Sequence, residues 1–255
     1  MYNDWLTIGP FTIHGYGVMV GLGILAAFIV SERQAKKVGM NADEASNLIF
    51  ICLITGFLGS KLLYILTNLQ GFLQNPKAFL SADGWVVWGG IIGGLVGGWF
   101  WCKFRKLDFF AYFDLMIPVV ALAQGFGRIG CFFAGCCYGK ETDGFGVVFP
   151  SGSLAPSGVK LIPTQLISSF GDFLLFYILY RIYNDPEHRN ETGAWYLILY
   201  SVGRFLVEFL RGDEIRGTIM GLSTSQFISI FMFFAGVALL AVRKKNRVKP
   251  ELTGV

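Results

Sequence analysis

Long apolar stretches separated by short polar segments dominate the chain. A transmembrane helix needs about 20 mostly apolar residues to cross the hydrocarbon core of a bilayer. By this measure we predict seven spans, near residues 14–31, 46–66, 85–102, 109–134, 164–183, 194–210 and 219–242. The pattern therefore predicts an all-α integral membrane protein with seven transmembrane helices, which form a single transmembrane domain over residues 1–255.

The polar segments differ in their content of basic residues. Thirteen Lys and Arg residues fall on one side of the predicted spans and five on the other, and three, Lys61, Arg128 and Arg204, lie within spans. Because cytoplasmic loops carry the excess of Lys and Arg, the side with thirteen is predicted to be cytoplasmic. Seven spans then place the N-terminus outside and the C-terminus in the cytoplasm, with Arg128 toward the outer leaflet.

The composition agrees with burial in a membrane. Of the 255 residues, 54% are hydrophobic and only 15% are charged, against about 25% charged residues in soluble domains. The loop bias accounts for the net charge of +4, so we predict no nucleic-acid partner. The start of the chain lacks the basic region of a cleavable signal peptide, and the first apolar stretch is expected to remain as a span.

Arginines inside the predicted spans are the leading candidates for chemistry. A charge at membrane depth is costly, and it marks either a functional site or a buried ion pair. Arg128 follows an apolar run, while Arg204 and Glu208 share one helix face that Arg211 continues. One interpretation is an internal ion pair that neutralises itself. The other is a positive excess that binds an anion, since guanidinium grips phosphate with two hydrogen bonds. In the outer leaflet that anion is a phospholipid head group.

Other residues near the predicted outer face are weaker candidates. His14 and Tyr16 begin the first span, where aromatic residues often serve as interfacial anchors. Gly89 and Gly90 begin a series of glycine pairs that recur every four residues. This spacing is typical of close helix packing. The alternative is that these glycines form the floor of a ligand cavity. Gln165 begins the fifth span and is expected to face the outer cavity.

Three of the five cysteines, Cys131, Cys136 and Cys137, lie close together in the sequence. An odd number of cysteines argues against a full disulfide framework. A structural zinc site needs about four nitrogen or sulfur ligands, and no well-placed histidine completes one. A redox pair of adjacent cysteines would form a strained disulfide. We favour the interpretation that these cysteines are small residues that pack at a turn. We expect no metal.

The chain resembles the prolipoprotein diacylglyceryl transferase family over essentially its whole length. The matching residues are Tyr16-Gly17, Gly89-Gly90 with Gly93, Gly127-Arg128-x-Gly130-x-Phe132 with Gly139, Pro163-Thr164-Gln165-Leu166, and Gly203-Arg204-Phe205 with Glu208-Phe209-x-Arg211. The resemblance implies transfer of the sn-1,2-diacylglyceryl group from phosphatidylglycerol to the lipobox cysteine in a prolipoprotein signal peptide. A thioether forms and glycerol phosphate leaves, with no cofactor.

The resemblance also implies a location and roles for individual residues. The protein is expected to be a multi-pass protein of the bacterial cytoplasmic membrane, with a cavity open to the outer leaflet. Arg128 would hold the phosphate of phosphatidylglycerol, and Arg204 would act on the reacting centre. Tyr16 would position or polarise a substrate. Glu208 would orient Arg204, and Gly139 would allow close approach of the backbone.

The sequence departs from the family pattern at several positions. The commoner signature has asparagine at Cys131 and Ala134 and an acidic residue at Cys136, although a cysteine-bearing version also occurs. Trp88 and Ile162 stand where many members have histidine. A general base at either position cannot operate in this chain.

The sequence therefore does not decide which group accepts the proton of the thiol. The candidates are Tyr16, His14, and either water or the leaving phosphate. Two rival classes also remain at this point. One is a membrane thiol oxidoreductase that uses Cys136 and Cys137. The other is a transporter of an anionic solute that binds between Arg128 and Arg204. Arginines near one leaflet only favour a lipid enzyme over alternating access at the midplane.

Overall fold

A computed structural model describes residues 3–9, 11–79, 84–212, 217–219 and 221–252 of the chain. Arg216, which was counted in the charge bias, lies outside the described residues. The chain is mostly helical and divides into two compact units. Unit 1 contains Met1–Val30 and Asp114–Val255, and unit 2 contains Ser31–Phe113.

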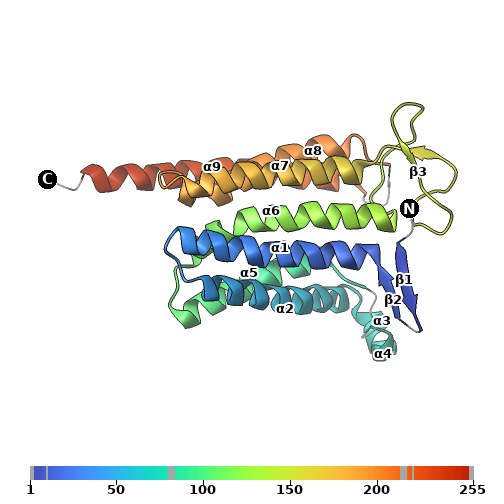
Figure 1. Cartoon of the computed structure of the whole chain (residues 1–255), viewed down its shortest axis with the longest axis horizontal. Helices are drawn as coiled ribbons and strands as arrows, with labels where there is room; N and C mark the ends of the chain where they lie inside the picture. Colours follow the sequence, from blue (N-terminus) through green and yellow to red (C-terminus); the bar gives the residue numbers. More distant parts are fainter. Residues whose placement is uncertain (1–2, 10, 80–83, 213–216, 220, 253–255) are drawn as a thin grey trace. The chain divides into compact units, whose positions relative to one another are not determined.

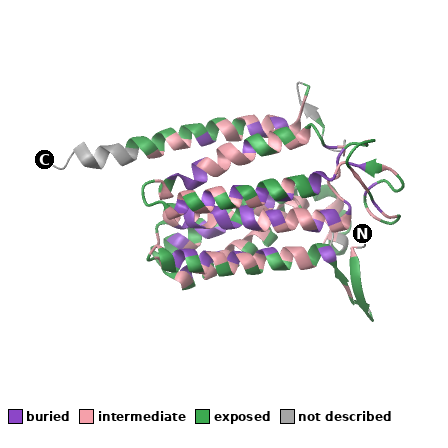
Figure 2. Cartoon of the chain, turned by 45° about the horizontal axis from the view of Figure 1, so that its top comes forward, coloured by how far each residue is buried: buried purple, intermediate pink, exposed green. Residues whose placement is uncertain are grey.

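Helices from the second half of the chain form the body of unit 1. The helices are α6 (Phe109–Ala134), α7 (Thr164–Asn184), α8 (Thr192–Glu208) and α9 (Thr224–Leu252), and unit 1 also includes the first part of α1 (Gly15–Lys37). α8 packs against both α7 and α9, so the three lie side by side (Figure 1). A 3-10 turn, η1 (Arg189–Glu191), connects α7 to α8. Leu175, Leu179 and Tyr183 recur every four residues along α7 and are all buried. Figure 2 shows buried residues alternating with exposed ones along the helices.

Three short antiparallel hairpins accompany the helices, so the prediction of an entirely helical chain was incomplete. They pair β1 (Asp4–Ile8) with β2 (Phe11–His14), β3 (Val147–Val148) with β4 (Lys160–Leu161), and β5 (Thr218–Ile219) with β6 (Leu222–Ser223). Four of the six described strands have only two residues, too few to show an alternating pattern. β1 and β2 lie in the short stretch before the first predicted span. Phe132 at the end of α6 packs with Phe149, Ala155 and Leu161, and this cluster anchors the loop that follows α6.

Unit 2 is built on the pairing of α2 (Ala42–Thr67) with α5 (Val87–Arg105). Two short helices, α3 (Leu69–Gln74) and α4 (Pro76–Phe79), lie between them in the sequence. A Cβ atom at Gly89 or Gly93 would clash with the carbonyl oxygens of Gly59 and Thr55, respectively. The glycine pairs therefore let two helix backbones touch, as small residues do in membrane helices.

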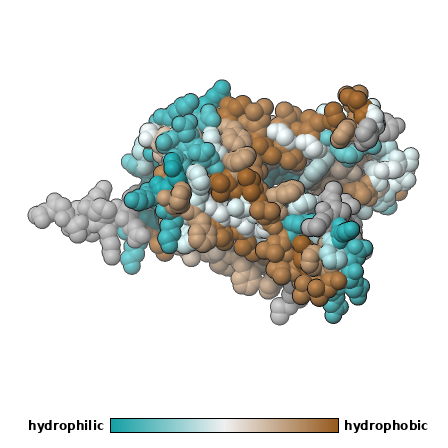
Figure 3. All heavy atoms as spheres, turned by 90° about the horizontal axis from the view of Figure 1, so that it is seen from below, coloured by the Kyte–Doolittle hydropathy of each residue, from teal (hydrophilic) through white to brown (hydrophobic). Residues whose placement is uncertain are grey.

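Each of the seven predicted stretches forms a helix: α1, α2, α5, α6, α7, α8 and α9. Within the described residues, five helices are long and apolar enough to cross a membrane: α1, α2, α6, α7 and Thr224–Lys245 of α9. α8 has only 17 residues, and α5, which contains six glycines, is not among these five helices. Hydrophobic side chains cover much of the helical surface visible in Figure 3, while hydrophilic ones gather near helix ends.

Candidate functional site

Arg128 lies near the C-terminal end of α6 and faces an acidic residue of α7. Its Nε is 3.9 Å from Oδ2 of Asp172, and the two side chains are 23% and 10% exposed. The helices meet closely here, because Ser169 Oγ donates a hydrogen bond to the carbonyl oxygen of Gly125 at 2.9 Å. A side chain at Gly125 would collide with the ring of Phe173. The α6–α7 contact therefore holds Arg128 opposite a carboxylate.

Arg204 and Arg211 share the carboxylate of Glu208. Arg204 Nη1 lies 2.6 Å from Glu208 Oε2, and Arg211 Nε lies 3.9 Å from the same oxygen. Arg204 Nη2 also donates to Ser225 Oγ on α9 at 2.7 Å. The three charged side chains are between 5% and 13% exposed. The ion pair predicted from the i, i+4 spacing is confirmed, and a second arginine joins it.

We call Arg128, Arg204 and Arg211, together with Asp172 and Glu208, the arginine cluster. Arg128 and Arg204 are close enough to repel each other electrostatically. Asp172 interacts with both guanidinium groups. Three guanidinium groups face two carboxylates, so the cluster carries one positive charge in excess. Such a cluster can bind an anion and supplies the planar donors that phosphate prefers.

The turn that follows α6 is held by two buried side chains from the start of α7. Gln165 Nε2 donates to the carbonyl oxygen of Cys136 at 2.7 Å, and Thr164 Oγ1 donates to that of Cys137 at 2.8 Å. Thr164 and Gln165 are each 1% exposed. Cys137 adopts a left-handed conformation with φ of 61°. The amide nitrogen of Gln165 is thus engaged within the protein, while its role toward substrate stays a prediction.

Gly139 lies where two other segments meet the loop. Its amide nitrogen donates to the carbonyl oxygen of Ile162 at 2.9 Å, and the next amide, of Lys140, donates to that of Leu210 at 2.9 Å. A Cβ atom at Gly139 would lie 2.7 Å from the Ile162 oxygen and 2.8 Å from the Leu210 oxygen. The close approach expected at Gly139 is therefore made by the chain's own backbone. This contact connects the loop after α6 to the end of α8.

The thiols of Cys131, Cys136 and Cys137 gather at the same turn. Their sulfur atoms all lie within 4.8 Å of one another, and all three residues are free cysteines of intermediate exposure. Hydrogen bonds from the other two thiols, together with Arg211, lower the pKa of Cys137. The same two neighbours and burial raise the pKa of Cys136. The turn therefore gathers three sulfur atoms beside one arginine.

Tyr16 and His14 belong to unit 1 but have different surroundings. Tyr16 packs against α6, since a Cβ atom at Gly130 would lie 3.1 Å from its ring. The Tyr16 hydroxyl is also within electrostatic range of Arg128. His14 ends β2, where its Nδ1 lies 2.6 Å from Oδ1 of Asp4 and both side chains are more than half exposed. The structure thus brings Tyr16 to the Arg128 helix and leaves His14 paired within the hairpin.

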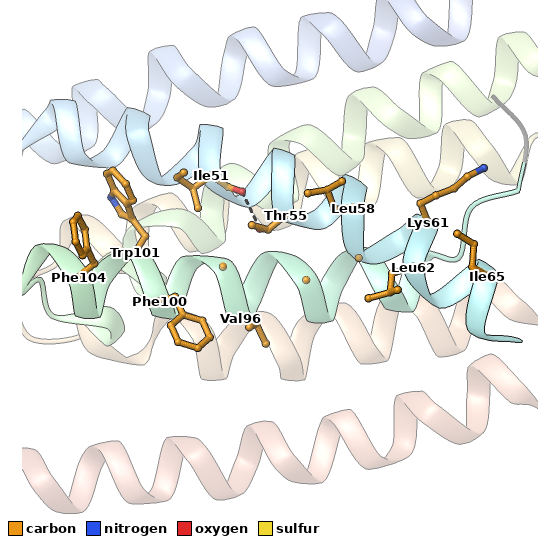
Figure 4. Close-up of a pocket in the computed structure, with 13 residues that line it drawn as sticks. Ile51, Thr55, Leu58, Lys61, Leu62, Ile65, Val96, Phe100, Trp101 and Phe104 are labelled. Carbon is orange, nitrogen blue, oxygen red and sulfur yellow. Dashed lines mark hydrogen bonds between the residues drawn. The ribbon is translucent and has the colours of Figure 1, made fainter. Parts of the chain in front are cut away.

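Gly89 and Gly90 lie in unit 2, where the clearest feature is an apolar groove between α2 and α5. The groove has a volume of about 830 Å³. Figure 4 shows Trp101 and Phe104 at one end and Lys61 at the other, with the Lys61 amine pointing away. Neither Gly89 nor Gly90 lines this groove. Helix packing accounts for Gly89, and a role of either residue in substrate binding stays a prediction.

Several polar contacts among the helices were missed in the sequence. Asp172 is the most important, and its signal was an acidic residue inside an apolar run. Gln124 Nε2 on α6 donates to the hydroxyl of Tyr196 on α8 at 3.0 Å. Asp114 Oδ1 accepts a hydrogen bond from the amide nitrogen of Gly193 at 2.8 Å. These contacts connect α6 to α8.

Comparison with known proteins gives consistent matches. A family described as "Prolipoprotein diacylglyceryl transferase" matches residues 4–242. A protein of Clostridium tetani is 47% identical over 227 residues, which cover 88% of this chain and 91% of the relative. A Clostridium perfringens protein is 44% identical over 235 residues, 91% of each chain. A Stenotrophomonas maltophilia protein is 32% identical, covering 97% of this chain and 94% of its own. All three are named phosphatidylglycerol–prolipoprotein diacylglyceryl transferase.

Proposed function

The chain belongs to the prolipoprotein diacylglyceryl transferase family, and we propose that its arginine cluster performs the family's reaction. The protein is a transferase that moves a diacylglyceryl group from phosphatidylglycerol to a prolipoprotein. One observation carries the assignment of the site. Three guanidinium groups face two carboxylates, which leaves one positive charge for an anionic lipid head group.

The chemistry requires a site that stabilises a departing phosphate. The thiol sulfur of the prolipoprotein cysteine attacks a glyceryl carbon, and a carbon–sulfur bond forms. The carbon–oxygen bond to the phosphate breaks, and glycerol phosphate leaves with the electron pair. Arg128 holds the phosphate, and Arg204 acts at the reacting centre. Donors that are already in place where charge develops make the largest contribution to such a step.

Neighbouring residues orient the two arginines and the substrates. Glu208 fixes Arg204 through their 2.6 Å ion pair, and Asp172 restrains Arg128 from α7. Tyr16 positions the incoming substrate beside Arg128. The thiol proton passes to Tyr16, to His14, or to water or the leaving phosphate.

Further predicted residues contribute to binding and to the shape of the site. Gly139 and Gln165 hold the loop that borders the arginine cluster. Within unit 2, Gly89 and Gly90 contribute to substrate binding. The acceptor is the lipobox cysteine of a prolipoprotein signal peptide. No metal or other cofactor takes part.

The same proposal includes the arrangement in the membrane. α5 and α8 complete seven spans in one transmembrane domain, with the N-terminus outside and the C-terminus in the cytoplasm. The cavity opens to the outer leaflet of the bacterial cytoplasmic membrane. The excess of Lys and Arg on one side of the helices supports this orientation.

The test offers purified protein phosphatidylglycerol and a lipobox peptide and measures release of glycerol phosphate. Arg128→Ala is expected to lower turnover at least about 100-fold, as loss of one preorganised donor does elsewhere. Arg181→Ala is the matched control, because Arg181 is exposed and its Nη1 donates a hydrogen bond to the hydroxyl of Tyr177, one turn away on α7, at 3.2 Å.

Two results would count against the proposal. The first is that the wild-type protein releases no glycerol phosphate, which is the result expected of a thiol oxidoreductase or an anion transporter. Equal losses in Arg128→Ala and Arg181→Ala would indicate damage to folding rather than removal of a catalytic group.

A further inference from the structure

We propose that Cys131, Cys136 and Cys137 form a binding site for one soft, thiophilic metal cation, of the class that includes Zn²⁺, Cd²⁺ and Cu⁺. The inference does not depend on the transferase reaction. It rests on the convergence of three sulfur atoms, on the rigidity of the turn that carries them, and on the charge beside them.

The distances among the sulfur atoms suit a shared ion. All three lie within 4.8 Å of one another. Zinc–sulfur bonds are about 2.3 Å long, so sulfur ligands of one ion lie about 3.8 Å apart in a tetrahedral site. Closing the thiols onto an ion therefore requires movements of about 1 Å or less, which rotation about side-chain bonds can supply.

The backbone of the turn is built to hold the thiols together. Neighbouring residues of an extended chain point to opposite sides, yet Cys136 and Cys137 direct their sulfur atoms to the same place. The left-handed conformations of Gly135 and Cys137 produce this arrangement. Buried donors from Thr164 and Gln165 fix the carbonyl oxygens of the two cysteines. Conformational strain at a non-glycine residue persists where the surroundings determine it and often marks a functional site.

Arg211 supplies the charge that such a site needs. Three thiolates around a divalent cation carry one net negative charge. Arg211 is only 8% exposed and interacts directly with the Cys137 thiol. Arg211 also shares the carboxylate of Glu208, so its guanidinium offsets part of the negative charge of the loaded site.

The donor set selects the type of cation. Within the described parts of the chain, the group contains only cysteines, with no histidine or carboxylate. Sulfur donors favour Cu⁺ and Zn²⁺ over Mg²⁺ or Ca²⁺. The sequence argued against a four-ligand structural zinc site, and a three-sulfur site with an open fourth position does not need that fourth ligand. Each thiol that binds releases its proton to solvent, and no atom changes oxidation state.

Cadmium is the probe for the first experiment, because thiolate binding to Cd²⁺ produces a charge-transfer absorption. Reduced, full-length protein in detergent is titrated with Cd²⁺ without oxygen. One Cd²⁺ per chain is expected to bind. The triple variant Cys131→Ala, Cys136→Ala, Cys137→Ala is expected to bind at least about 100-fold more weakly, since even supporting residues around metal sites contribute 10- to 100-fold. Competition with Zn²⁺ and with Cu⁺ then ranks the cations.

The matched control is the double variant Cys52→Ala, Cys102→Ala, which removes the two cysteines of unit 2. It is expected to keep the affinity within about threefold, as substitutions remote from a site usually do. Equal affinity in the triple variant and the wild type, or loss of binding in the control alone, would overturn the proposal.

A second measurement uses the wild-type protein alone, so it does not depend on the folding of a variant. One equivalent of Cd²⁺ is expected to protect Cys131, Cys136 and Cys137 from alkylation by a maleimide, as read by mass spectrometry. Unchanged alkylation of the three in the presence of Cd²⁺ would refute the site. So would a disulfide between two of them in protein prepared with reductant.

Discussion

The guanidinium of Arg128 on α6 lies 3.9 Å from the carboxylate of Asp172 on α7. The same carboxylate interacts with Arg204 on α8. One acidic residue thus pairs with Arg128 and attracts Arg204 electrostatically, while the two arginines repel each other. Asp172 is the link between the helices that carry the proposed phosphate-binding groups.

Replacing Asp172 by asparagine keeps the shape of the side chain and removes its charge. Asp172→Asn is expected to lower turnover about tenfold, because a charge-assisted contact contributes about 1.5–3 kcal/mol and this one is long. The Michaelis constant for phosphatidylglycerol should change less than kcat, since the positive excess remains. Glycerol phosphate release at varied lipid concentrations measures both, with Asp143→Asn in the exposed loop as control. A purely larger Michaelis constant would contradict the positioning role.

Gly139 tests whether the loop after α6 must touch the end of α8. Gly139→Ala places a Cβ atom 2.7 Å from a backbone oxygen of Ile162. Because neither backbone segment can retreat easily, we expect a loss of about 1–3 kcal/mol in stability, together with most of the activity. Gly21→Ala is the control, as nothing lies within 4 Å of a Cβ atom there. Thermal unfolding in detergent compares the two, and equal unfolding temperatures would refute the contact.

Thr164→Val removes the hydroxyl that donates to Cys137 and keeps a similar shape. The carbonyl oxygen of Cys137 then loses its donor, and leaving such a group unsatisfied costs about 1–3 kcal/mol. We expect faster hydrogen–deuterium exchange of the amides in residues 135–140. Thr67→Val, at the exposed end of α2, should leave that exchange unchanged. Unaltered protection in Thr164→Val would show that other contacts hold the turn.

Neighbouring glycines of α5 offer a sharp comparison in unit 2. A Cβ atom at Gly93 would clash with the carbonyl oxygen of Thr55, whereas one at Gly94 would lie 3.6 Å from the nearest atom, the carbonyl oxygen of Cys52. Gly93→Ala should therefore weaken the α2–α5 pair by about 1–3 kcal/mol. Gly94→Ala should be neutral or stabilising, since alanine favours helix more than glycine does. Unfolding in detergent distinguishes the two, and equal effects would argue against close packing.

Local patterns in the sequence predicted the helices and one ion pair. The i, i+4 spacing of Arg204 and Glu208 determines a shared helix face, and the structure confirms their contact. The pairing of Arg128 with Asp172 depends on how α6 packs against α7, which spacing along one chain does not reveal. The sequence therefore indicated Arg128 as an unusual charge inside an apolar stretch, but it did not identify Asp172 as its partner.

The structure of the loop after α6 could be predicted only in part from the sequence. Gly139 was expected to allow a close approach, and the structure identifies Ile162 and Leu210 as the segments that approach it. The amide nitrogen of Gln165 holds the carbonyl of Cys136, and the expectation that Gln165 faces a cavity stays a prediction. The gathering of three thiols depends on left-handed backbone at Gly135 and Cys137. Such conformations follow from contacts distant in sequence and leave no periodic signal.

The glycine contact between α2 and α5 also bears on how the chain enters the membrane during synthesis. The most apolar window of α2 has a mean hydropathy of 2.1, and α5 is not among the candidate membrane spans of the described residues. Close approach of two backbones at small residues stabilises a helix pair in lipid. We therefore expect α2 and α5 to be inserted as a pair, with the contact at the glycines supporting the insertion of α5.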